Sequence, residues 1–237
     1  MKKLISRPRS IIPACDVSDR EKFEHLIKET CGVPGIGGYK VGLELTIQYG
    51  LKLLVDITRK YTNLPIIYDH QKGGTDIPEL GIKFSKVCQS AGVEAVILFP
   101  FAGLATEKEW IKACQDAGLV VIVGGHMTQE SFLSSEGGFI ADNGPQRIYI
   151  IAAELGVADF VVPGNKPEVV AHYKKQIENS GISPTLYAPG FVAQGGVITE
   201  CGRVAGESWH AIVGSAIYGA KDIKEAANIL THQLDGP

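Results

Sequence analysis

Short apolar runs alternate along the chain with longer stretches in which apolar residues recur at helical spacing. Eight apolar runs end near Gly, Pro or Asp, and they lie at residues 10–16, 35–42, 64–70, 94–100, 118–125, 157–164, 184–190 and 209–215. Buried strands that alternate with amphipathic helices are typical of a parallel sheet covered by helices. Eight such units predict an α/β fold of the (β/α)8 TIM barrel type, and an open doubly wound sheet is the main alternative.

The amphipathic stretches between these runs include residues 19–31, 45–61, 77–92 and 106–118. No linker or low-complexity segment interrupts the alternation, and α/β barrels commonly reach a length of 237 residues as one domain. We therefore expect a single (β/α)8 barrel domain over residues 1–237. In such a barrel the active site lies at the carboxyl ends of the strands.

Composition limits the class of partner. Hydrophobic residues make up 45% of the chain and charged residues 21%, as in an ordinary soluble globular protein. The formal net charge of -3, with both signs spread along the chain, argues against a nucleic acid or an anionic membrane as partner. No stretch is apolar enough for a signal peptide or a membrane span, so we expect a cytoplasmic protein.

Cysteine and histidine give no metal pattern. The five cysteines are widely spaced with no CxxC pair, which argues against a disulfide framework and a structural zinc site. Cys15, Cys88 and Cys114 lie in apolar contexts and are expected to be buried. His70 and His126 fall at strand ends and could line a site, but the histidines lack metal-ligand spacing and none is assigned a catalytic role.

The sharpest chemical signal follows the third apolar run, where the chain reads DHQKGGTD. Asp69, Lys72 and Asp76 place one positive charge between two negative charges at the end of a core strand. A lysine held between carboxylates stays protonated and can serve as a positioned proton donor. Asp76 alone, followed by Ile77 and Pro78, has the pattern of a helix start with proline in the first turn. The three charges together favour a catalytic role.

Two more charged residues belong to the first two runs. Lys40 lies inside the apolar second run, where an inward lysine needs a partner, and Asp69 on the neighbouring strand would be one. A lysine that extends to solvent from the strand end is the alternative. Asp16 ends the first run, where it can accept hydrogen bonds from sugar hydroxyls or cap a helix that begins near Ser18.

Glycine-rich loops follow the last two runs, with the sequences APGFVAQGGV at 188–197 and IVGSAIYGA at 212–220. Loops after strands 7 and 8 of a barrel frequently hold phosphate through backbone N–H groups, and glycine permits the close approach. We expect these loops to bind an anion, with Gln194 as a side-chain donor and Pro189, Gly214 and Ser215 in contact with the substrate.

Taken in order, these motifs resemble those of a known family. Asp16 in the first strand, YKVG in the second, an Asp…Lys…Asp-Ile-Pro run at the third, GHMT after the fifth and PGFVAQGG after the seventh extend over nearly the entire chain. The chain is similar to the orotidine 5'-phosphate decarboxylase family in its single-domain microbial form. The resemblance implies a (β/α)8 homodimer that needs neither metal nor organic cofactor. It also implies conversion of orotidine 5'-monophosphate to UMP and CO2 in pyrimidine synthesis.

The resemblance assigns roles to individual residues. Lys72 is expected to donate the proton to C6, with Asp69 beside the substrate carboxylate. Asp76 is expected to reach into the site of the partner subunit. Lys40 would tie Asp69 to the ribose, and Asp16 would take a ribose hydroxyl. A separate set contacts the rest of the substrate: Thr128 the pyrimidine, and Gln194 both phosphate and base, as a lid.

The chain departs from the family pattern at two places. The usual Asp-x-Lys-x-x-Asp spacing is longer here, and the arginine expected after the glycine of the eighth strand is Ser215. Arg203 precedes that strand and should lie at the opposite face of the barrel. We expect either Lys166, or the Ser215 hydroxyl with nearby backbone N–H groups, to hold the phosphate instead.

Two other functions remain possible from the residues. One is a magnesium-dependent sugar-phosphate decarboxylase or synthase of the same superfamily, although those families carry a glutamate where this chain has Lys40. The other is a catalytically silent barrel that binds a nucleotide without turnover, made conceivable by the altered spacing and by Ser215.

Overall fold

The structure is a computed structural model that describes residues 3–70 and 73–235. The strands are β1 (Arg9–Pro13), β2 (Tyr39–Val41), β3 (Ile66–Asp69), β4 (Ala95–Leu98), β5 (Val120–Gly124), β6 (Asp159–Val161), β7 (Thr185–Ala188) and β8 (Trp209–Val213). The helices are α1 (Arg20–Thr30), α2 (Leu43–Tyr49), α3 (Leu51–Arg59), α4 (Leu80–Ala91), α5 (Leu104–Asp116), α6 (Gly144–Glu154), α7 (Pro167–Asn179), α8 (Ile198–Ala205), α9 (Ser215–Tyr218) and α10 (Ile223–His232). Two short 3-10 helices are η1 (Ser134–Glu136) and η2 (Gln233–Asp235).

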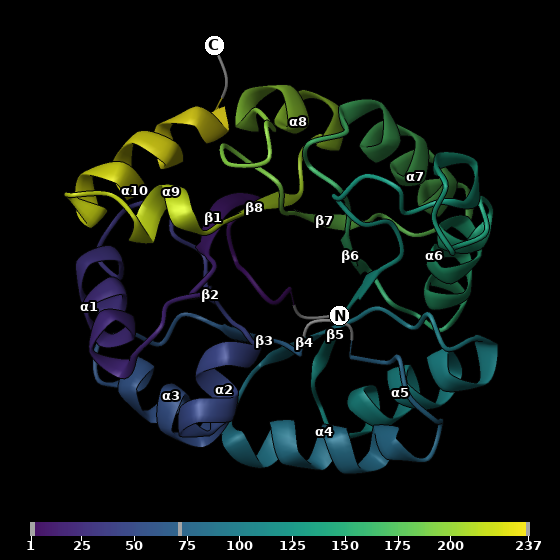
Figure 1. Ribbon diagram of the computed structural model, residues 1–237, viewed down its shortest axis with the longest axis horizontal. Helices are drawn as coiled ribbons and strands as arrows, with labels where there is room; N and C mark the ends of the chain where they lie inside the picture. The colour runs from purple at the N-terminus through teal and green to yellow at the C-terminus, as the bar shows by residue number, and fades with distance from the viewer. Residues whose placement is uncertain (1–2, 71–72, 236–237) are drawn as a thin grey trace.

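All of the strand pairs are parallel, and the sheet runs in the order β1-β8-β7-β6-β5-β4-β3-β2. Isolated bridges from Ile11 to Ile36 and from Ala14 to Lys40 join β1 to the segment that contains β2, which brings the two ends of the sheet together. The strands surround the centre of the molecule, and the helices form a ring outside them (Figure 1). The expected (β/α)8 barrel is confirmed.

Each strand is buried on both of its faces. In β4, Ile97 points into an interior cluster with Ile67, Ile122 and Ile212, whereas its neighbour Val96 belongs to the larger cluster beneath the helices. Successive strand side chains point to opposite faces, so a continuously apolar run can fill both clusters. Burying each such side chain stabilises the fold by about 1.5–3 kcal/mol. The strands therefore need apolar residues on both faces, and this is why they coincide with the apolar runs of the sequence.

The amino-terminal end of the barrel interior is filled. Ile5, from the segment before β1, is buried and packs into the same interior cluster as Ile12. Ser10 and His210 form a buried hydrogen bond of 2.7 Å nearby on the paired strands β1 and β8. The open space of the barrel is therefore at the carboxyl ends of its strands.

The helical stretch expected at residues 45–61 is two helices. Gly50 separates α2 from α3 with a φ of 79°, a conformation that side chains disfavour, and its N–H still bonds to the Thr46 carbonyl. The expectation that Asp76 begins a helix with Pro78 in the first turn is wrong. Helix α4 starts at Leu80, and the Asp76 carboxylate instead accepts the N–H of Ile77.

A partly buried carboxyl lies at the start of β6. Asp159 accepts a hydrogen bond of 3.0 Å from the Tyr187 hydroxyl on β7. Burial raises the pKa of Asp159 to about 6, and the Tyr187 hydrogen bond and the positive charge of Lys3 only partly oppose this shift. Because the folded pKa is above the ordinary value of 3.8, the fold is most stable relative to the unfolded chain when Asp159 is protonated.

The substitution Asp159→Asn keeps an acceptor for Tyr187 and removes the charge. We expect no gain in the free energy of unfolding below about pH 4, a rising gain between about pH 4 and 6, and a constant gain of about 1–3 kcal/mol above that. Urea denaturation at several pH values measures it, with the exposed Asp116→Asn as control. A gain that is the same at every pH would contradict the electrostatic cause.

Candidate active site

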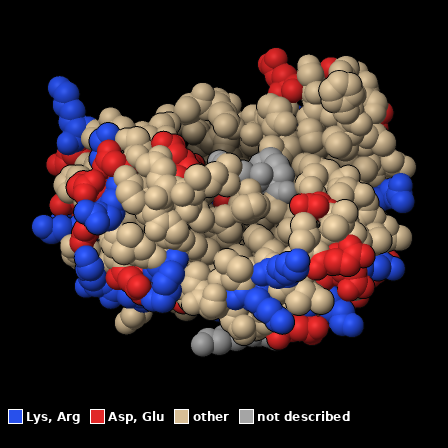
Figure 2. Space-filling model, turned by 60° about the horizontal axis from the view of Figure 1, so that its bottom comes forward, with Lys and Arg blue, Asp and Glu red and all other residues tan. Residues whose placement is uncertain are grey.

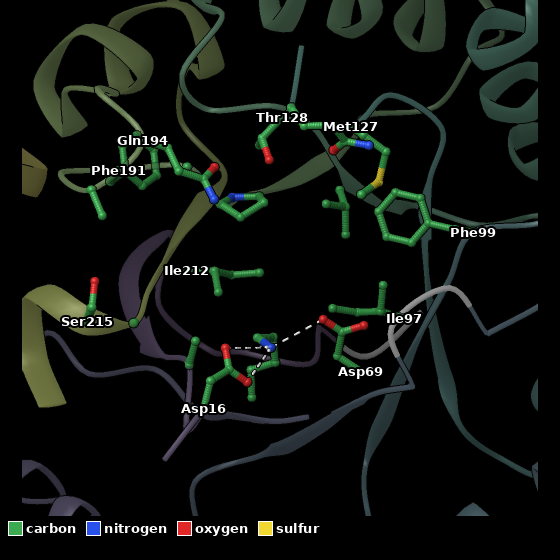
Figure 3. Close-up of a pocket in the computed structure, with 18 of the residues that line it drawn as sticks. Asp16, Asp69, Ile97, Phe99, Met127, Thr128, Phe191, Gln194, Ile212 and Ser215 are labelled. Carbon is green, nitrogen blue, oxygen red and sulfur yellow. Dashed lines mark hydrogen bonds and ion pairs between the residues drawn. The ribbon is translucent and has the colours of Figure 1, made fainter. Parts of the chain in front are cut away.

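A cavity of about 470 Å³ opens at the carboxyl ends of the strands. Figure 2 shows a hollow in the surface that is surrounded mainly by uncharged atoms with a few acidic ones, and positive and negative side chains are interspersed toward the edges of the face. Side chains from the first three strands and from the loops after β5, β7 and β8 line this cavity (Figure 3). The concentration of ionisable residues and glycine loops predicted at these strand ends is present.

Lys40 is the centre of the charged part of the cavity. Its ammonium lies 3.3 and 3.4 Å from the two oxygens of Asp16 and 3.2 Å from Asp69 Oδ2 (Figure 3). Lys40 is only 5% exposed. Burial alone would lower the pKa of the ammonium, but Asp69 and Asp16 together outweigh this and hold the pKa above the ordinary lysine value. The three side chains therefore form a charged cluster with a protonated lysine.

Two predictions from sequence are resolved by this cluster. The inward orientation of Lys40 with Asp69 as partner is confirmed, and the alternative of a lysine extended to solvent is wrong. The cap of α1 is Asp19, whose carboxylate accepts the N–H of Lys22, so the alternative role of Asp16 as a helix cap is also wrong. Asp16 faces the cavity.

The segment after β3 is fastened to its neighbours by backbone groups. The Gly73 carbonyl accepts the N–H of Phe99 at 2.6 Å, and the Thr75 hydroxyl donates to the Phe99 carbonyl at 2.6 Å. Lys72, the expected proton donor, lies outside the described residues. The expected place of Lys72 at the cavity stays a prediction, as does the way in which the longer spacing is accommodated.

Asp76 is exposed and does not line the cavity of its own chain. Its backbone carbonyl accepts a hydrogen bond of 2.7 Å from the Thr106 hydroxyl, and the next carbonyl, of Ile77, accepts one of 3.0 Å from Trp110 Nε1. These bonds hold the segment against α5. The sequence grouped Asp76 with Asp69, but the described fold separates the two within one chain.

The loop after β5 places His126, Met127 and Thr128 in the cavity wall. His126 Nε2 lies 3.2 Å from the Lys166 ammonium, and its Nδ1 lies 3.0 Å from the Tyr173 hydroxyl. Burial, with the positive charge of Lys166 next, lowers the pKa of His126 to about 4. The imidazole is therefore neutral at pH 7, and since an ammonium can only donate, Nε2 accepts from it. Through these two contacts His126 ties the loop after β5 to α7.

Two residues named from sequence are engaged elsewhere. Lys166 is absent from the cavity lining, because its ammonium contacts His126 and lies 3.9 Å from Glu136. His70 forms a hydrogen bond with Tyr68 and packs on Phe84, away from the cavity lining.

The loop after β7 contributes Pro189 and Gln194 to the cavity lining. The Gly190 carbonyl accepts the N–H of Gly196 at 3.1 Å, which closes the loop on itself. Gly190 has a φ of 104°, and a side chain there would lie 3.1 Å from Thr128 Cγ2. Only glycine satisfies both constraints. The loop therefore depends on its glycines, as the sequence suggested.

Gly214 and Ser215, between the end of β8 and the start of α9, complete the lining. Ser215 lies across the cavity from Ile97 and Asp69 (Figure 3). Sequence reasoning missed two kinds of residue. Asn165 joins loops, because its side chain donates to the Thr128 carbonyl at 3.1 Å and lies beside Gly190. The apolar wall is formed by strand and loop side chains such as Ile97 and Phe99, which resemble ordinary core residues in sequence.

No described helix is long and apolar enough to span a membrane. Within residues 3–70 and 73–235, no three His, Cys, Asp or Glu side chains are grouped so that they could hold a metal ion. The charged cluster pairs two carboxylates with an ammonium, which is a poor donor set for a cation because Lys40 already supplies the positive charge.

A parallel barrel whose strand ends combine an ion cluster with glycine-rich loops defines the class of (β/α)8-barrel enzymes. Within that class, the family model for the "Orotidine 5'-phosphate decarboxylase / HUMPS family" matches residues 9–229. The chain belongs to this family, and the resemblance found in its motifs is confirmed.

Several relatives match over nearly their full length. The orotidine 5'-phosphate decarboxylase of Methanosarcina barkeri is 31% identical over 228 residues, which cover 95% of this chain and 94% of that protein. The orotidine 5'-phosphate decarboxylase of Thermococcus kodakarensis is 27% identical over 226 residues, 94% of this chain and 96% of that protein. The fold is similar to the crystal structure of orotidine 5'-monophosphate decarboxylase from Methanocaldococcus jannaschii complexed with the inhibitor BMP. The TM-score is 0.83 at 24% identity, covering 97% of this chain and all of that one.

We predict that Lys40→Met lowers the free energy of unfolding at pH 7.5 by about 2–4 kcal/mol, because it leaves the carboxylates of Asp16 and Asp69 facing each other without a cation. Urea denaturation measures the change. Lys52→Met, which breaks an exposed pair with Asp56, is the control and should cost less than about 0.5 kcal/mol. The loss at Lys40 should shrink at pH 4, where protonation relieves the repulsion. An equal loss at both pH values would indicate packing instead.

Proposed function

We propose that this chain decarboxylates orotidine 5'-monophosphate to UMP and CO2 without a metal or an organic cofactor. The observation that carries the proposal is the buried Lys40 ammonium between Asp16 and Asp69, in a cavity whose other side is formed by the glycine loops after β7 and β8. Family membership and curated relatives named for this activity over most of their length support it. On this proposal residues 1–237 act as one barrel domain, in the cytoplasm.

In the proposed mechanism Lys72 donates the proton to C6 as the carboxylate leaves. Lys72 follows Asp69, the last residue of β3, by three positions, so its side chain can reach the mouth of the barrel. Loss of CO2 leaves an electron pair at C6 with little delocalisation, and an ammonium already in place stabilises it. Asp69 holds a second negative charge beside the substrate carboxylate, and this repulsion is relieved when the bond to C6 breaks, because CO2 leaves as a neutral molecule and the electron pair stays on C6.

Other residues bind and orient the substrate. Asp16, held by Lys40, accepts a ribose hydroxyl. Thr128 contacts the pyrimidine, and Gln194 reaches both base and phosphate from the loop after β7. The phosphate lies beside Gly214 and Ser215, and the neighbouring loop that contains Pro189 closes over it. Contacts to the phosphate are remote from C6, so they can supply the binding energy that closes the loop.

We also propose a homodimer in which Asp76 completes the site of the partner subunit. Asp76 is held against α5 and does not line its own cavity. The surface near it is unusually apolar for a monomer: Ile77 is 57% exposed, Leu104 46% and Phe139 fully exposed. Beside Leu104 and Phe139, Glu107 is buried with an oxygen that has no hydrogen-bond partner among the described residues, and burial raises its pKa to about 8. A second subunit would cover this face.

The catalytic proposal is tested by mixing the purified protein with orotidine 5'-monophosphate in EDTA and following ultraviolet absorbance. We expect turnover, and we expect Lys72→Ala to reduce kcat by at least about 10²–10⁴-fold because the positioned acid is lost. Lys83→Ala, exposed on α4, is the control. Turnover that requires magnesium and a sugar phosphate would favour the superfamily alternative. Nucleotide binding with unchanged absorbance would favour a silent barrel.

The shared site is tested by mixing inactive variants. If Asp76 acts across the interface, a heterodimer of Lys72→Ala and Asp76→Ala chains contains one fully intact site and one doubly altered site. Unfolding and refolding a 1:1 mixture should then restore roughly a quarter of wild-type activity, since about half of random dimers are mixed. No recovery in dimers of confirmed composition would show that Asp76 acts within its own chain, and an Asp76→Ala protein that is fully active by itself would show that Asp76 has no catalytic role.

A further inference from the structure

The cavity at the barrel mouth is charged on one side and neutral on the other (Figure 3). Among the described residues that line it, Lys40 is the only cation, and Asp16 and Asp69 already neutralise its ammonium. The other side presents the hydroxyl groups of Ser215 and Tyr218. A phosphate dianion bound there would have neutral donors alone, whereas hydrogen bonds from a cation are roughly twice as strong.

A second cavity, of about 560 Å³, adjoins the first. The two cavities share Asp16 and Tyr218 as lining residues. Lys22 and Lys221 bring positive charge to the second cavity, and Glu44 brings negative charge. The positive charge that is absent beside Ser215 is therefore present in the adjoining cavity, which shares Tyr218 with the first.

The two lysines differ in what they contact. Lys22 lies 3.0 Å from the carboxylate of Asp19, the residue that caps α1. Lys221 makes no hydrogen bond or ion pair within the part of the chain that the structure describes. Its neighbour Asp222 uses its carboxylate to cap α10, accepting the N–H of Glu225 at 2.9 Å, and so does not neutralise it. Lys221 is an exposed lysine with a free ammonium at the edge of a cavity.

Other nearby cations are held elsewhere. Lys166 contacts His126 and lies 3.9 Å from Glu136, and it lines neither cavity. Arg203 is exposed in the last turn of α8, which leads into the amino-terminal end of β8, at the opposite end of the barrel from the cavity. Lys221 follows the single turn of α9, whose first residue is Ser215, so one short segment connects the neutral side to a free ammonium.

We propose that Lys221 is the cation that binds the 5'-phosphate of the nucleotide, reaching past Tyr218 from the second cavity. This inference rests on the proposed function, because it assumes a nucleotide whose phosphate lies beside Gly214 and Ser215. A lysine suits the position, since its ammonium is a point charge on a flexible stem that can contact phosphate from several directions. Lys221 is a binding residue, remote from C6, and sets the preference for a phosphorylated ligand.

The test compares UMP with uridine, which lacks the phosphate, by calorimetry at low ionic strength. Lys221→Gln should weaken UMP binding by about 10- to 100-fold and leave uridine binding unchanged. Lys221→Arg should retain most of the affinity for UMP. Lys224→Gln, an exposed charge three residues further on that lines neither cavity, should bind both ligands as the wild type does.

Three results would overturn the assignment: Lys221→Gln binding UMP as tightly as the wild type, Lys221→Arg binding it as weakly as Lys221→Gln, or equal losses for UMP and uridine. A failure of the assignment of Lys221 can be distinguished from a failure of the proposed decarboxylase activity. Wild-type protein that binds UMP but leaves orotidine 5'-monophosphate unchanged would refute the decarboxylase and leave the comparison at Lys221 valid. Wild-type protein that fails to bind UMP would refute both.

Discussion

The burial of one ammonium between two carboxylates is the constraint on which the site depends. Lys40 is the middle residue of β2, so its position is set by the barrel. Burial of its ammonium would destabilise the fold by several kcal/mol if Asp16 and Asp69 did not both lie beside it. Asp69 ends β3 and Asp16 follows the end of β1 by three residues, and these two strands lie on either side of β2, so the cluster fixes three neighbouring strand ends together. A charge network of this kind is weak support for stability in general, but it defines one arrangement of carboxylates.

The barrel supplies the rigidity that this arrangement requires. Strand register sets Lys40 opposite Ile67, two residues before Asp69, so the acidic side chain reaches beyond the lysine toward the mouth. The opposite side of the cavity is made differently, from loops whose shape depends on glycine and on backbone hydrogen bonds. A rigid charged side and an adaptable neutral side suit a substrate that reacts at one end and is gripped at the other.

The barrel could be predicted from the sequence alone, because strands that are buried on both faces appear as continuous apolar runs. It also identified Lys40, Asp16 and Asp69, since ionisable residues next to core strands demand partners. It did worse where tertiary contacts decide the outcome. Gly50 broke a helix that periodicity alone joined, and Lys166 proved to be held by His126, a contact between residues 40 positions apart.

The apolar wall and Asn165 left no distinctive signal, because an isoleucine that faces a ligand and one that faces the core have the same neighbours in sequence. Asp76 shows a further limit. Its motif placed it with Asp69, while the described chain ties its backbone to α5 and leaves its side chain exposed. Closeness in a sequence motif does not show which of its residues line the same cavity in the fold.

The interior cluster that includes Ile5 closes the amino-terminal end of the barrel, and this limits the routes by which ligands can enter and leave. Because that end is filled, the mouth of the cavity is the one opening to the barrel interior among the described residues, so the nucleotide and CO2 must both pass through it. If the loop after β7 closes over the substrate as proposed, carbon dioxide leaves either past the bound nucleotide or after the loop has opened. On the proposed mechanism, slow opening of that loop would therefore limit the release of both products, however fast the bond from C6 to the carboxylate breaks.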